Sequence, residues 1–299
     1  MNIKQTSRYV PYNYGHLHLR VLTPVNADMT KPPLLMLHGA MSNGRVFYSE
    51  SGKGLGCYLA AAGVVVYVLD TSGRGSSTPK IGRGFSAGQG EVIREQLPLI
   101  QQYILSLHPN ADTVHWCGHS WGGVLMASAI ARFEYLQHSV ASLVTFGSKR
   151  RIEVKSLSKW IKVDLVWNKI APLIARYRGY LPAEKLRIGM DNESQSSLLQ
   201  TIDWVQGYWI DHDDGFDYSL AAKQAKWPRS WFIAAQGDKV LGNPSDVKRM
   251  MLECQIPTAD YTLLSRQHGF KHDYTHAGML THQDAVKDHF PRVLDWYQS

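Results

Sequence analysis

The 299-residue sequence predicts an α/β fold, with a mostly parallel central sheet, helices on both faces and an inserted helical cap. Short apolar runs alternate with longer segments of helical periodicity, and this order is typical of parallel strands joined by helices. Residues 149–225 break the alternation with short helical patterns and four tryptophans, and it returns after Pro228. We therefore expect a first core part at 1–148, a mainly helical cap at 149–225 and a second core part at 226–299.

The expected strands are continuous apolar runs, which suit strands covered on both faces. The run at 16–22 differs, because its apolar and polar residues alternate and so indicate a half-buried strand. Helices are expected where apolar residues recur every three or four positions, and Pro98 should kink one of them. The strands lie at 16–22, 34–37, 64–69, 114–117, 142–148, 231–235 and 261–264, and the helices at 51–62, 90–108, 124–131, 243–251 and 283–296.

Composition and charge narrow the class of protein. Hydrophobic residues make up 44% and charged residues 19%, a balance that can bury a sizeable core. The formal net charge is +7, yet no basic run exceeds the three residues at 149–151 and no nucleic-acid motif is present. We expect a moderately basic enzyme with no nucleic-acid partner. The charge leaves anionic substrates or membrane surfaces open, and nothing in the sequence fixes an oligomeric state.

The cysteines and apolar segments favour a cytoplasmic protein. Cys57, Cys117 and Cys254 are far apart and are expected to be free, mostly buried thiols in a reducing compartment. The first residues lack the apolar stretch of a signal peptide. The longest apolar run, 55–69, contains glycines and is shorter than a membrane span. We therefore expect no stable membrane insertion.

The pattern Gly-His-Ser-Trp-Gly at 118–122 lies between an expected strand and an expected helix. In a strand–turn–helix elbow of this kind, Ser120 occupies a strained turn that pushes its hydroxyl into a cleft. Gly118 and Gly122 are expected to come so close together that a Cβ on either would clash. The Trp121 amide and the helix N-terminus lie beneath the serine, where they can stabilise negative charge.

A second donor for such an oxyanion hole is expected after the strand at 34–37. That strand ends in His38-Gly39, and the glycine lets the backbone turn sharply. The amide of Ala40 or Met41 would supply the donor, and we favour Met41.

A nucleophilic serine also needs a base within reach and an acid that orients the base. In proteins with this elbow the chain order is serine, acid, histidine. Asp238 directly follows an expected core strand and suits the acid. The downstream histidines are His268, His272, His276, His282 and His289, of which we expect the last two to lie on the surface.

These motifs together resemble the α/β-hydrolase superfamily, in particular its capped lipases and esterases. The resemblance covers nearly the whole core and is carried by the segments 38–39, 70–77, 118–122, 237–238 and 273–276. In similar lipase-like proteins the catalytic histidine lies in an Asp-Tyr-x-His stretch shortly before the final helix, which here implies His276. His268, followed by Gly269-Phe270, is the alternative.

The resemblance implies a serine hydrolase that cleaves acyl esters through an acyl-enzyme, with Ser120, Asp238 and His276 as the triad. The expected partner is a small-molecule ester, with no cofactor. A metal is not expected either, because the spacing of His272 and His276 lacks the H-E-x-x-H pattern. Thioesterase, other acyl-transfer or C–C hydrolase chemistry on the same triad remains the alternative, as does a ligand receptor without turnover.

Three further segments carry expectations. Aliphatic side chains of the cap either line an acyl pocket or only pack the cap onto the core. The acidic run at 211–214 is expected to be a solvated loop rather than a metal site. Asp70 and Arg74 should tie the loop at 70–77 near the active site. The cap residues in question are Leu173, Ile174, Leu181, Leu198, Leu199 and Ile202.

Overall fold

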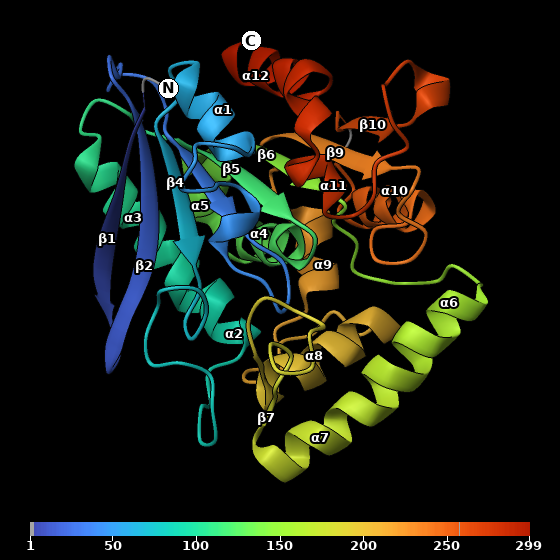
Figure 1. Cartoon of the computed structure of the whole chain (residues 1–299). Coiled ribbons are helices and arrows are strands. Elements are labelled where there is room, and N and C mark those ends of the chain that lie inside the picture. Colours follow the sequence, from blue (N-terminus) through green and yellow to red (C-terminus); the bar gives the residue numbers. More distant parts are fainter. Residues whose placement is uncertain (1–2, 257) are drawn as a thin grey trace.

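The computed structural model describes residues 3–256 and 258–299, and its centre is one eight-stranded sheet (Figure 1). The strand order is β1-β2-β4-β3-β5-β6-β9-β10. The pairs from β4 to β10 are all parallel, so the predicted mostly parallel sheet is confirmed. The strands are β1 (Ile3–Tyr12), β2 (Gly15–Pro24), β3 (Leu34–Leu37), β4 (Val66–Asp70), β5 (Val114–His119), β6 (Val140–Phe146), β9 (Arg229–Ala235) and β10 (Asp260–Leu264).

An antiparallel hairpin extends the parallel sheet at one edge. β1 pairs with β2, and β2 pairs with β4, both in antiparallel register. The sequence predicts β2 but not β1. The reason is that β1 is an outer strand with Val10 as its one fully buried residue, so it lacks the apolar run or regular alternation that marks the other strands.

Helices cover both faces of the sheet, as predicted. Side chains of β3 alternate between two hydrophobic clusters: Leu35 and Leu37 belong to one, Leu34 and Met36 to the other. One cluster includes residues of α3 (Leu97–Leu107), α4 (Trp121–Arg132) and α10 (Pro244–Glu253), and the other includes residues of α1 (Leu55–Ala61) and α12 (Phe290–Gln298).

Two predicted helices are interrupted. The helix expected at 90–108 consists of α2 (Gln89–Glu91), the π-helix η2 (Val92–Gln96) and α3. The π-helical turn lies just before Pro98, where the missing N–H and the bulk of the ring prevent a regular α-helical turn. The helix expected at 283–296 consists of the short η5 (Gln283–Lys287) and α12.

Between β6 and β9 the chain leaves the sheet and forms a group of elements that we call the insertion, most of which lies in the lower part of Figure 1, with α9 nearer the centre. Its small hydrophobic cluster is separate from the two sheet clusters. Its last helix, α9, returns to pack on α4 of the core. The expected cap boundaries at 149 and 225 stay a prediction. The elements are α6 (Leu157–Lys159), η3 (Trp160–Ile170), α7 (Ala171–Arg178), β7 (Tyr180–Leu181), β8 (Glu193–Ser194), α8 (Gln195–Gln206) and α9 (Tyr218–Gln224). Within residues 3–256 and 258–299, every helix is too short or too polar to span a bilayer.

The acidic run at 211–214 helps to fasten the insertion to the core. The expectation of a solvated loop is wrong for Asp211, whereas His212, Asp213 and Asp214 are exposed. Asp211 is buried and accepts hydrogen bonds from Arg94 at 2.8 Å and from the Tyr218 hydroxyl at 2.7 Å. Arg132 of α4 pairs with Asp214. The arginines come from core helices, so these pairs hold the end of the insertion against the core.

Candidate active site

Ser120 lies between β5 and α4, with φ 53° and ψ −123°. A positive φ is uncommon for a residue other than glycine, so the turn is strained. The Ser120 amide donates a hydrogen bond to the Phe146 carbonyl at the end of β6, at 2.8 Å. The Trp121 amide opens α4 and therefore has no acceptor in its own helix. The chain thus has the strand–turn–helix geometry that the sequence pattern predicts.

Gly118 and Gly122 both lie where a side chain cannot fit, and a Cβ on Gly118 would lie 3.0 Å from the Gly122 carbonyl carbon. A Cβ on Gly118 would overlap the backbone of Gly123. A Cβ on Gly122 would overlap the carbonyl oxygens of Leu37 and His38. The need for Gly122 thus comes from the neighbouring strand β3 rather than from contact with Gly118.

Asp238 and His276 are 38 residues apart in the sequence, and their side chains meet: His276 Nδ1 lies 2.5 Å from Asp238 Oδ2. Asp238 follows β9 and is buried, whereas His276 is half-buried in the loop before α11 (Gly278–Thr281). Because Nδ1 donates to the carboxylate, Nε2 remains for another partner. Within the described residues, Ser120 Oγ makes no hydrogen bond to this ring.

Two contacts hold His276 beside the elbow. Its carbonyl accepts a hydrogen bond from His119 Nε2 at 3.2 Å, and the two rings have centroids 4.8 Å apart. Gly147 adopts φ 61°, and a Cβ there would lie 3.0 Å from His276 Nδ1. His119 immediately precedes Ser120, so the histidine loop is anchored on the same turn that carries the serine. Burial lowers the pKa of His119 to about 3, which keeps its ring neutral.

The electrostatics around Asp238 favour its charged form. Burial by itself raises the pKa of Asp238, but the hydrogen bond and the charge of His276 outweigh it and hold that pKa below the ordinary value. The Gly242 amide and the Lys149 ammonium act in the same direction. The carboxylate is therefore ionised at neutral pH and can orient an imidazole.

Lys149 is a site residue that the sequence indicates only as part of a basic run. It is buried, and its Nζ lies 5.9 Å from the centre of the Trp121 ring. Burial lowers the pKa of Lys149 to about 8, although the charges of Asp238 and Asp246 oppose this shift. One signal was available: Lys149 directly follows the strand predicted at 142–148, and the carboxyl ends of parallel strands face the site.

The other histidines lie elsewhere. His268, the alternative base, is exposed in η4 (Arg266–His268), and its Nδ1 hydrogen-bonds to Ser265 Oγ at 2.7 Å. His289 is buried, and the expectation of a surface position is wrong. Its Nε2 hydrogen-bonds to the Met279 carbonyl at 2.7 Å, because α12 packs its first turn inward against α11.

The Met41 amide, our expected oxyanion donor, already has an acceptor. It donates to Glu193 Oε2 of the insertion at 3.2 Å, and Arg74 pairs with the other carboxylate oxygen. Glu193 is fully buried between these partners. The Met41 backbone also adopts φ 51°, and its carbonyl accepts hydrogen bonds from Met190 and Asp191. Among the described residues, the Ala40 amide has no acceptor.

Asp70 and Arg74 tie the loop after β4 to its surroundings, as predicted. Asp70 accepts hydrogen bonds from the Gly44 amide at 2.7 Å, the Ser76 amide at 2.9 Å and His18 Nδ1 at 2.8 Å. Arg74 reaches the insertion through Glu193. The loops after β3 and β4 are therefore fixed to each other and to the insertion.

The pocket beside the elbow is small and is lined by both polar and apolar side chains. Its volume is about 30 Å³, and its lining includes Ala40, Trp121, Arg74 and Glu193. That volume holds roughly two water molecules. None of the six cap aliphatics, for which pocket lining was one of the two alternatives, is part of this lining. Leu181, Leu198 and Ile202 pack inside the insertion, Ile174 packs partly buried against them, Leu199 is half-buried and Leu173 is exposed.

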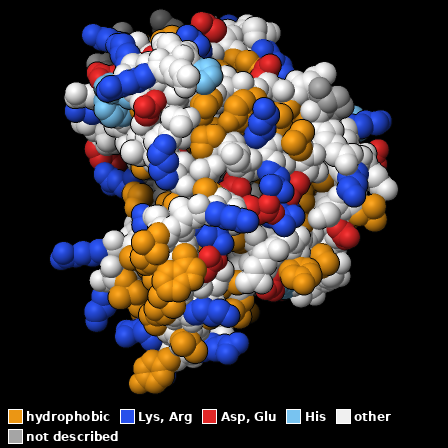
Figure 2. All heavy atoms as spheres, turned by 90° about the vertical axis from the view of Figure 1, so that its right-hand side faces the viewer, with side chains coloured by type: hydrophobic (Ala, Val, Ile, Leu, Met, Phe, Trp, Pro, Cys, Tyr) orange, Lys and Arg blue, Asp and Glu red, His pale blue; other side chains and the backbone are white. Residues whose placement is uncertain are grey.

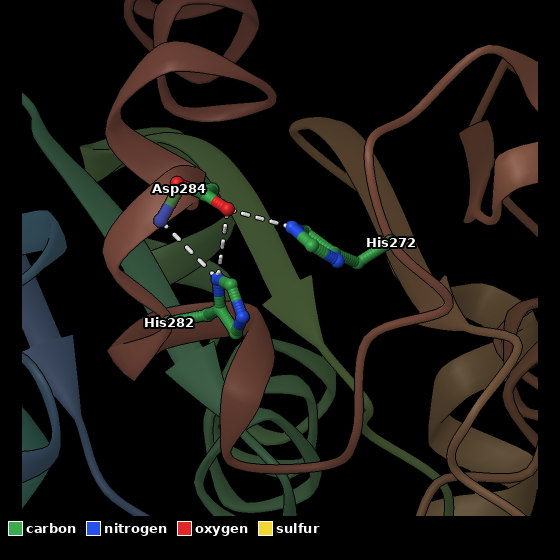
Figure 3. Close-up of side chains that lie close together, drawn as sticks. All are labelled: His272, His282 and Asp284. Carbon is green, nitrogen blue, oxygen red and sulfur yellow. Dashed lines mark hydrogen bonds and ion pairs between the residues drawn. The ribbon is translucent and has the colours of Figure 1, made fainter.

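A separate group with metal-ligand chemistry lies near the histidine loop (Figure 3). The ligand atoms of His272, His282 and Asp284 are within 4.8 Å of one another. They already satisfy each other: His272 Nε2 lies 2.7 Å from Asp284 Oδ2, and His282 Nδ1 accepts the Asp284 amide at 3.2 Å. His272 therefore belongs to this group and does not form a pair of metal ligands with His276.

Comparisons with known proteins agree with this architecture. No curated protein sequence matched the chain. Among solved structures, a soluble variant of monoglyceride lipase from Saccharomyces cerevisiae matches with a TM-score of 0.69 and 12% identity, over 98% of this chain and 94% of that one. An esterase from Rhodococcus sp. matches with a TM-score of 0.55 and 15% identity, over 100% and 99%. The thioesterase domain from the curacin biosynthetic pathway matches with a TM-score of 0.58 and 14% identity, over 99% and 100%.

At such identities the solved structures show the fold alone. The sequence itself matches the family model described as the alpha/beta hydrolase fold over residues 32–197, more than half of the chain. That segment includes the elbow serine and both strand-end loops beside it. The chain therefore belongs to the α/β-hydrolase family.

Proposed function

We propose that the protein is a serine hydrolase of the lipase and carboxylesterase kind, which cleaves carboxylic esters through an acyl-enzyme. One observation carries the proposal: the 2.5 Å contact between His276 Nδ1 and the buried Asp238 carboxylate, anchored on the turn that holds Ser120. A buried carboxylate fixes the tautomer and orientation of the ring and stabilises the imidazolium that forms during reaction.

In the proposed mechanism, Ser120 Oγ attacks the ester carbonyl while His276 Nε2 takes the hydroxyl proton. The tetrahedral intermediate collapses as His276 returns that proton to the leaving alcohol. Water then attacks the acyl-enzyme with His276 as the base, and the acid and the free Ser120 hydroxyl are released. In this conformation Ser120 does not hydrogen-bond to His276 within the described chain, so we expect a side-chain rotation to complete the contact when substrate binds.

For the oxyanion hole we propose the amides of Trp121 and Ala40. Trp121 opens α4, so its amide and the positive end of the helix are available to an anion. We assign the second donor to Ala40 instead of Met41, because the Met41 amide is held by Glu193 at 3.2 Å. Moving that amide to an oxyanion would leave the buried Glu193 carboxylate short of a donor.

We further propose that residues 149–225 act as the cap and that it must shift to admit a substrate. The pocket of about 30 Å³ is too small for even a short acyl chain. The loops after β3 and β4 and the insertion segment around Glu193 form its walls, so movement of this segment is the simplest way to enlarge it. The length of the acyl chains that the protein accepts therefore depends on an open state of the cap.

The test combines covalent labelling with turnover. A fluorophosphonate probe should form an adduct on Ser120, found by peptide mass spectrometry, and the Ser120→Ala protein should remain unlabelled. Nitrophenyl esters from acetyl to palmitoyl, and matched acyl thioesters, then report the substrate class. Labelling at another residue, or unchanged turnover in folded Ser120→Ala, would overturn the proposal. Faster turnover of thioesters than of esters would move the function to a thioesterase.

A further inference from the structure

The longest helix of the insertion is supported on one side only. α6, the π-helix η3 and α7 follow one another without a break from residue 157 to 178, and the helix stands away from the sheet (Figure 1). Its buried residues are Val163, Ala171 and Ala175. The rest of the helix is partly or fully exposed, so most of its circumference faces solvent.

Large hydrophobic side chains gather on the exposed part of this helix. Apart from the adjacent pair Trp160 and Ile161, they recur at intervals of three to five residues, and the interval of five falls where the π-helical hydrogen bonds widen the turn. Leu157 is 73% exposed, Leu173 64% and Tyr177 84%. Figure 2 shows hydrophobic side chains clustered over the lower part of the molecule, where the insertion lies. The members of this stripe, which we call the cap stripe, are Leu157, Trp160, Ile161, Leu165, Ile170, Leu173 and Tyr177.

Basic side chains accompany the cap stripe. Lys162, Lys169, Arg176 and Arg178 are exposed and form no ion pair with another described residue. The one acidic residue of the helix, Asp164, is already paired with Lys159 at 2.7 Å. The helix therefore presents apolar area with an excess of positive charge, and Figure 2 shows Lys and Arg side chains around the hydrophobic patch.

An exposed apolar patch of this kind marks a surface that is covered in use, because water-facing apolar area is unfavourable. The basic side chains indicate which kind of partner covers the cap stripe. A second copy of this chain would bring the same positive charges together if the stripe packed against itself. A bilayer with anionic lipids offers apolar depth for the stripe and opposite charge for the lysines and arginines, whose stems can lie along it.

We propose that the helix 157–178 docks in the plane of an anionic phospholipid surface, with the cap stripe in the interface and the basic side chains at the lipid phosphates. The helix does not cross the bilayer, since charged residues recur along its whole length. Binding is reversible and weakens with salt, because part of it is electrostatic.

The helix that carries the cap stripe is connected through the chain to the loop beside the active site. α7 leads through β7 into the segment 189–193, where Met190 and Asp191 donate to the Met41 carbonyl and Glu193 accepts from the Met41 amide. A surface that displaces the helix therefore pulls on the loop beside Ser120. This link to catalysis rests on the proposed function, whereas surface binding itself does not.

The experiment uses the full-length Ser120→Ala protein, so that hydrolysis cannot change the lipids. Vesicles of phosphatidylcholine, with and without phosphatidylglycerol, are sedimented and the bound fraction is measured. The apolar variant is Leu157→Ser, Leu173→Ser and Tyr177→Ser. Its control carries three comparably exposed sites elsewhere: Tyr14→Ser, Val25→Ser and Leu252→Ser. The charge variant, with Lys162, Lys169 and Arg176 changed to Gln, is matched by Lys31, Lys53 and Lys223 changed to Gln.

Binding to vesicles with phosphatidylglycerol is expected, with weak binding to phosphatidylcholine alone. The apolar variant should lose about tenfold or more in affinity, and the charge variant about fivefold for each basic residue removed. Both controls should stay within about twofold of the parent, although each control replaces as many exposed apolar side chains, or removes as many positive charges, as the variant that it matches. Equal losses in variant and control would overturn the proposal, because bulk charge or hydrophobicity would then explain binding.

Two further readouts keep the proposal falsifiable. Fluorescence of Trp160, isolated by difference from a Trp160→Phe protein, should shift to shorter wavelength on anionic vesicles, and no shift would contradict the proposed depth. The protein could instead form dimers that the apolar substitutions disrupt and the other substitutions leave intact, and not bind vesicles. In that case the cap stripe is an interface between two copies of the chain. Turnover of soluble esters by the wild type is measured separately. Failure of turnover with intact vesicle binding removes the proposed function alone, and the reverse removes this proposal alone.

Discussion

The Met41 amide donates a hydrogen bond to the buried carboxylate of Glu193, 152 residues further along the chain, at 3.2 Å. Arg74 pairs with the second oxygen of the same carboxylate. One side chain of the insertion thus holds the loop after β3 and the loop after β4. Glu193 therefore couples the position of the insertion to the backbone beside the proposed oxyanion hole.

The first prediction concerns stability. Glu193→Gln should lower the free energy of unfolding by about 3 kcal/mol, because it leaves the buried Arg74 guanidinium without a counter-charge. Glu50→Gln is the control, since Glu50 pairs with Arg20 at an exposed position and should cost less than about 1 kcal/mol. Urea unfolding gives both values, and a double variant with Arg74→Met should recover part of the loss. Additive losses in the double variant would show that the pair is not coupled.

The second prediction separates the two candidate bases. His276→Ala should reduce kcat by at least about 10³-fold, because the proton acceptor for Ser120 is lost. His268→Ala should change kcat by less than about twofold, since that ring is exposed and hydrogen-bonded to Ser265. Steady-state kinetics on a soluble ester, with melting curves to show that both proteins fold, give the comparison. The reverse order of the two losses would move the base to His268.

The sequence predicts the parts of the site that depend on local patterns. The elbow at Ser120 and the two loops after core strands follow from short motifs, because a turn that requires glycine or a buried strand leaves a local signal. The meeting of Asp238 and His276 was expected through the family resemblance. The geometry adds how the pair is held, through His119 and the positive φ of Gly147.

Contacts between residues that are far apart in the sequence leave no local pattern from which they can be predicted. Glu193 is one acidic residue among several in a segment without strong periodicity, and nothing local indicates that its partners are Met41 and Arg74. Asp211 looked like part of a solvated run because its arginine partners lie on distant helices. For the hydrophobic cap residues the sequence left pocket lining and packing as alternatives, because periodicity cannot distinguish packing inside the insertion from exposure on its outer side.

The third prediction follows from the buried Lys149. Its pKa is lowered from the ordinary 10.5 to about 8, so below about pH 8 both the folded and the unfolded chain hold the proton and the full burial penalty is present. Between about pH 8 and pH 10.5 the unfolded chain binds more protons than the folded one, so the free energy of unfolding rises with pH. A Lys149→Met protein has no ionisable group at this position and therefore lacks this contribution to the pH dependence. The wild type should therefore gain stability relative to Lys149→Met as pH rises through this window, on the order of 3 kcal/mol in total.

Urea unfolding at several pH values across that window measures the difference. Lys223→Met serves as the control, because Lys223 is exposed and its substitution removes the same charge without a burial penalty. A constant difference between wild type and Lys149→Met at every pH would mean that Lys149 keeps its proton in the folded protein.

The last prediction uses Gly39, which abuts the proposed nucleophile. A Cβ on Gly39 would lie 2.9 Å from Ser120 Cβ and 3.3 Å from the His119 carbonyl oxygen. Both neighbours belong to the strained elbow, which is fixed by β5, β6 and α4 and cannot yield without moving Ser120. Gly39→Ala should therefore displace the hydroxyl and lower kcat by about 10²-fold, with a smaller relative effect on KM.

Gly82→Ala is the matched control, because a Cβ there meets nothing within 4 Å among the described residues. The rate of fluorophosphonate labelling at Ser120 should fall in parallel with kcat in Gly39→Ala and stay unchanged in Gly82→Ala. Full labelling and turnover in a folded Gly39→Ala protein would mean that the elbow tolerates the extra carbon, and the strain at Ser120 would then not be what positions the nucleophile.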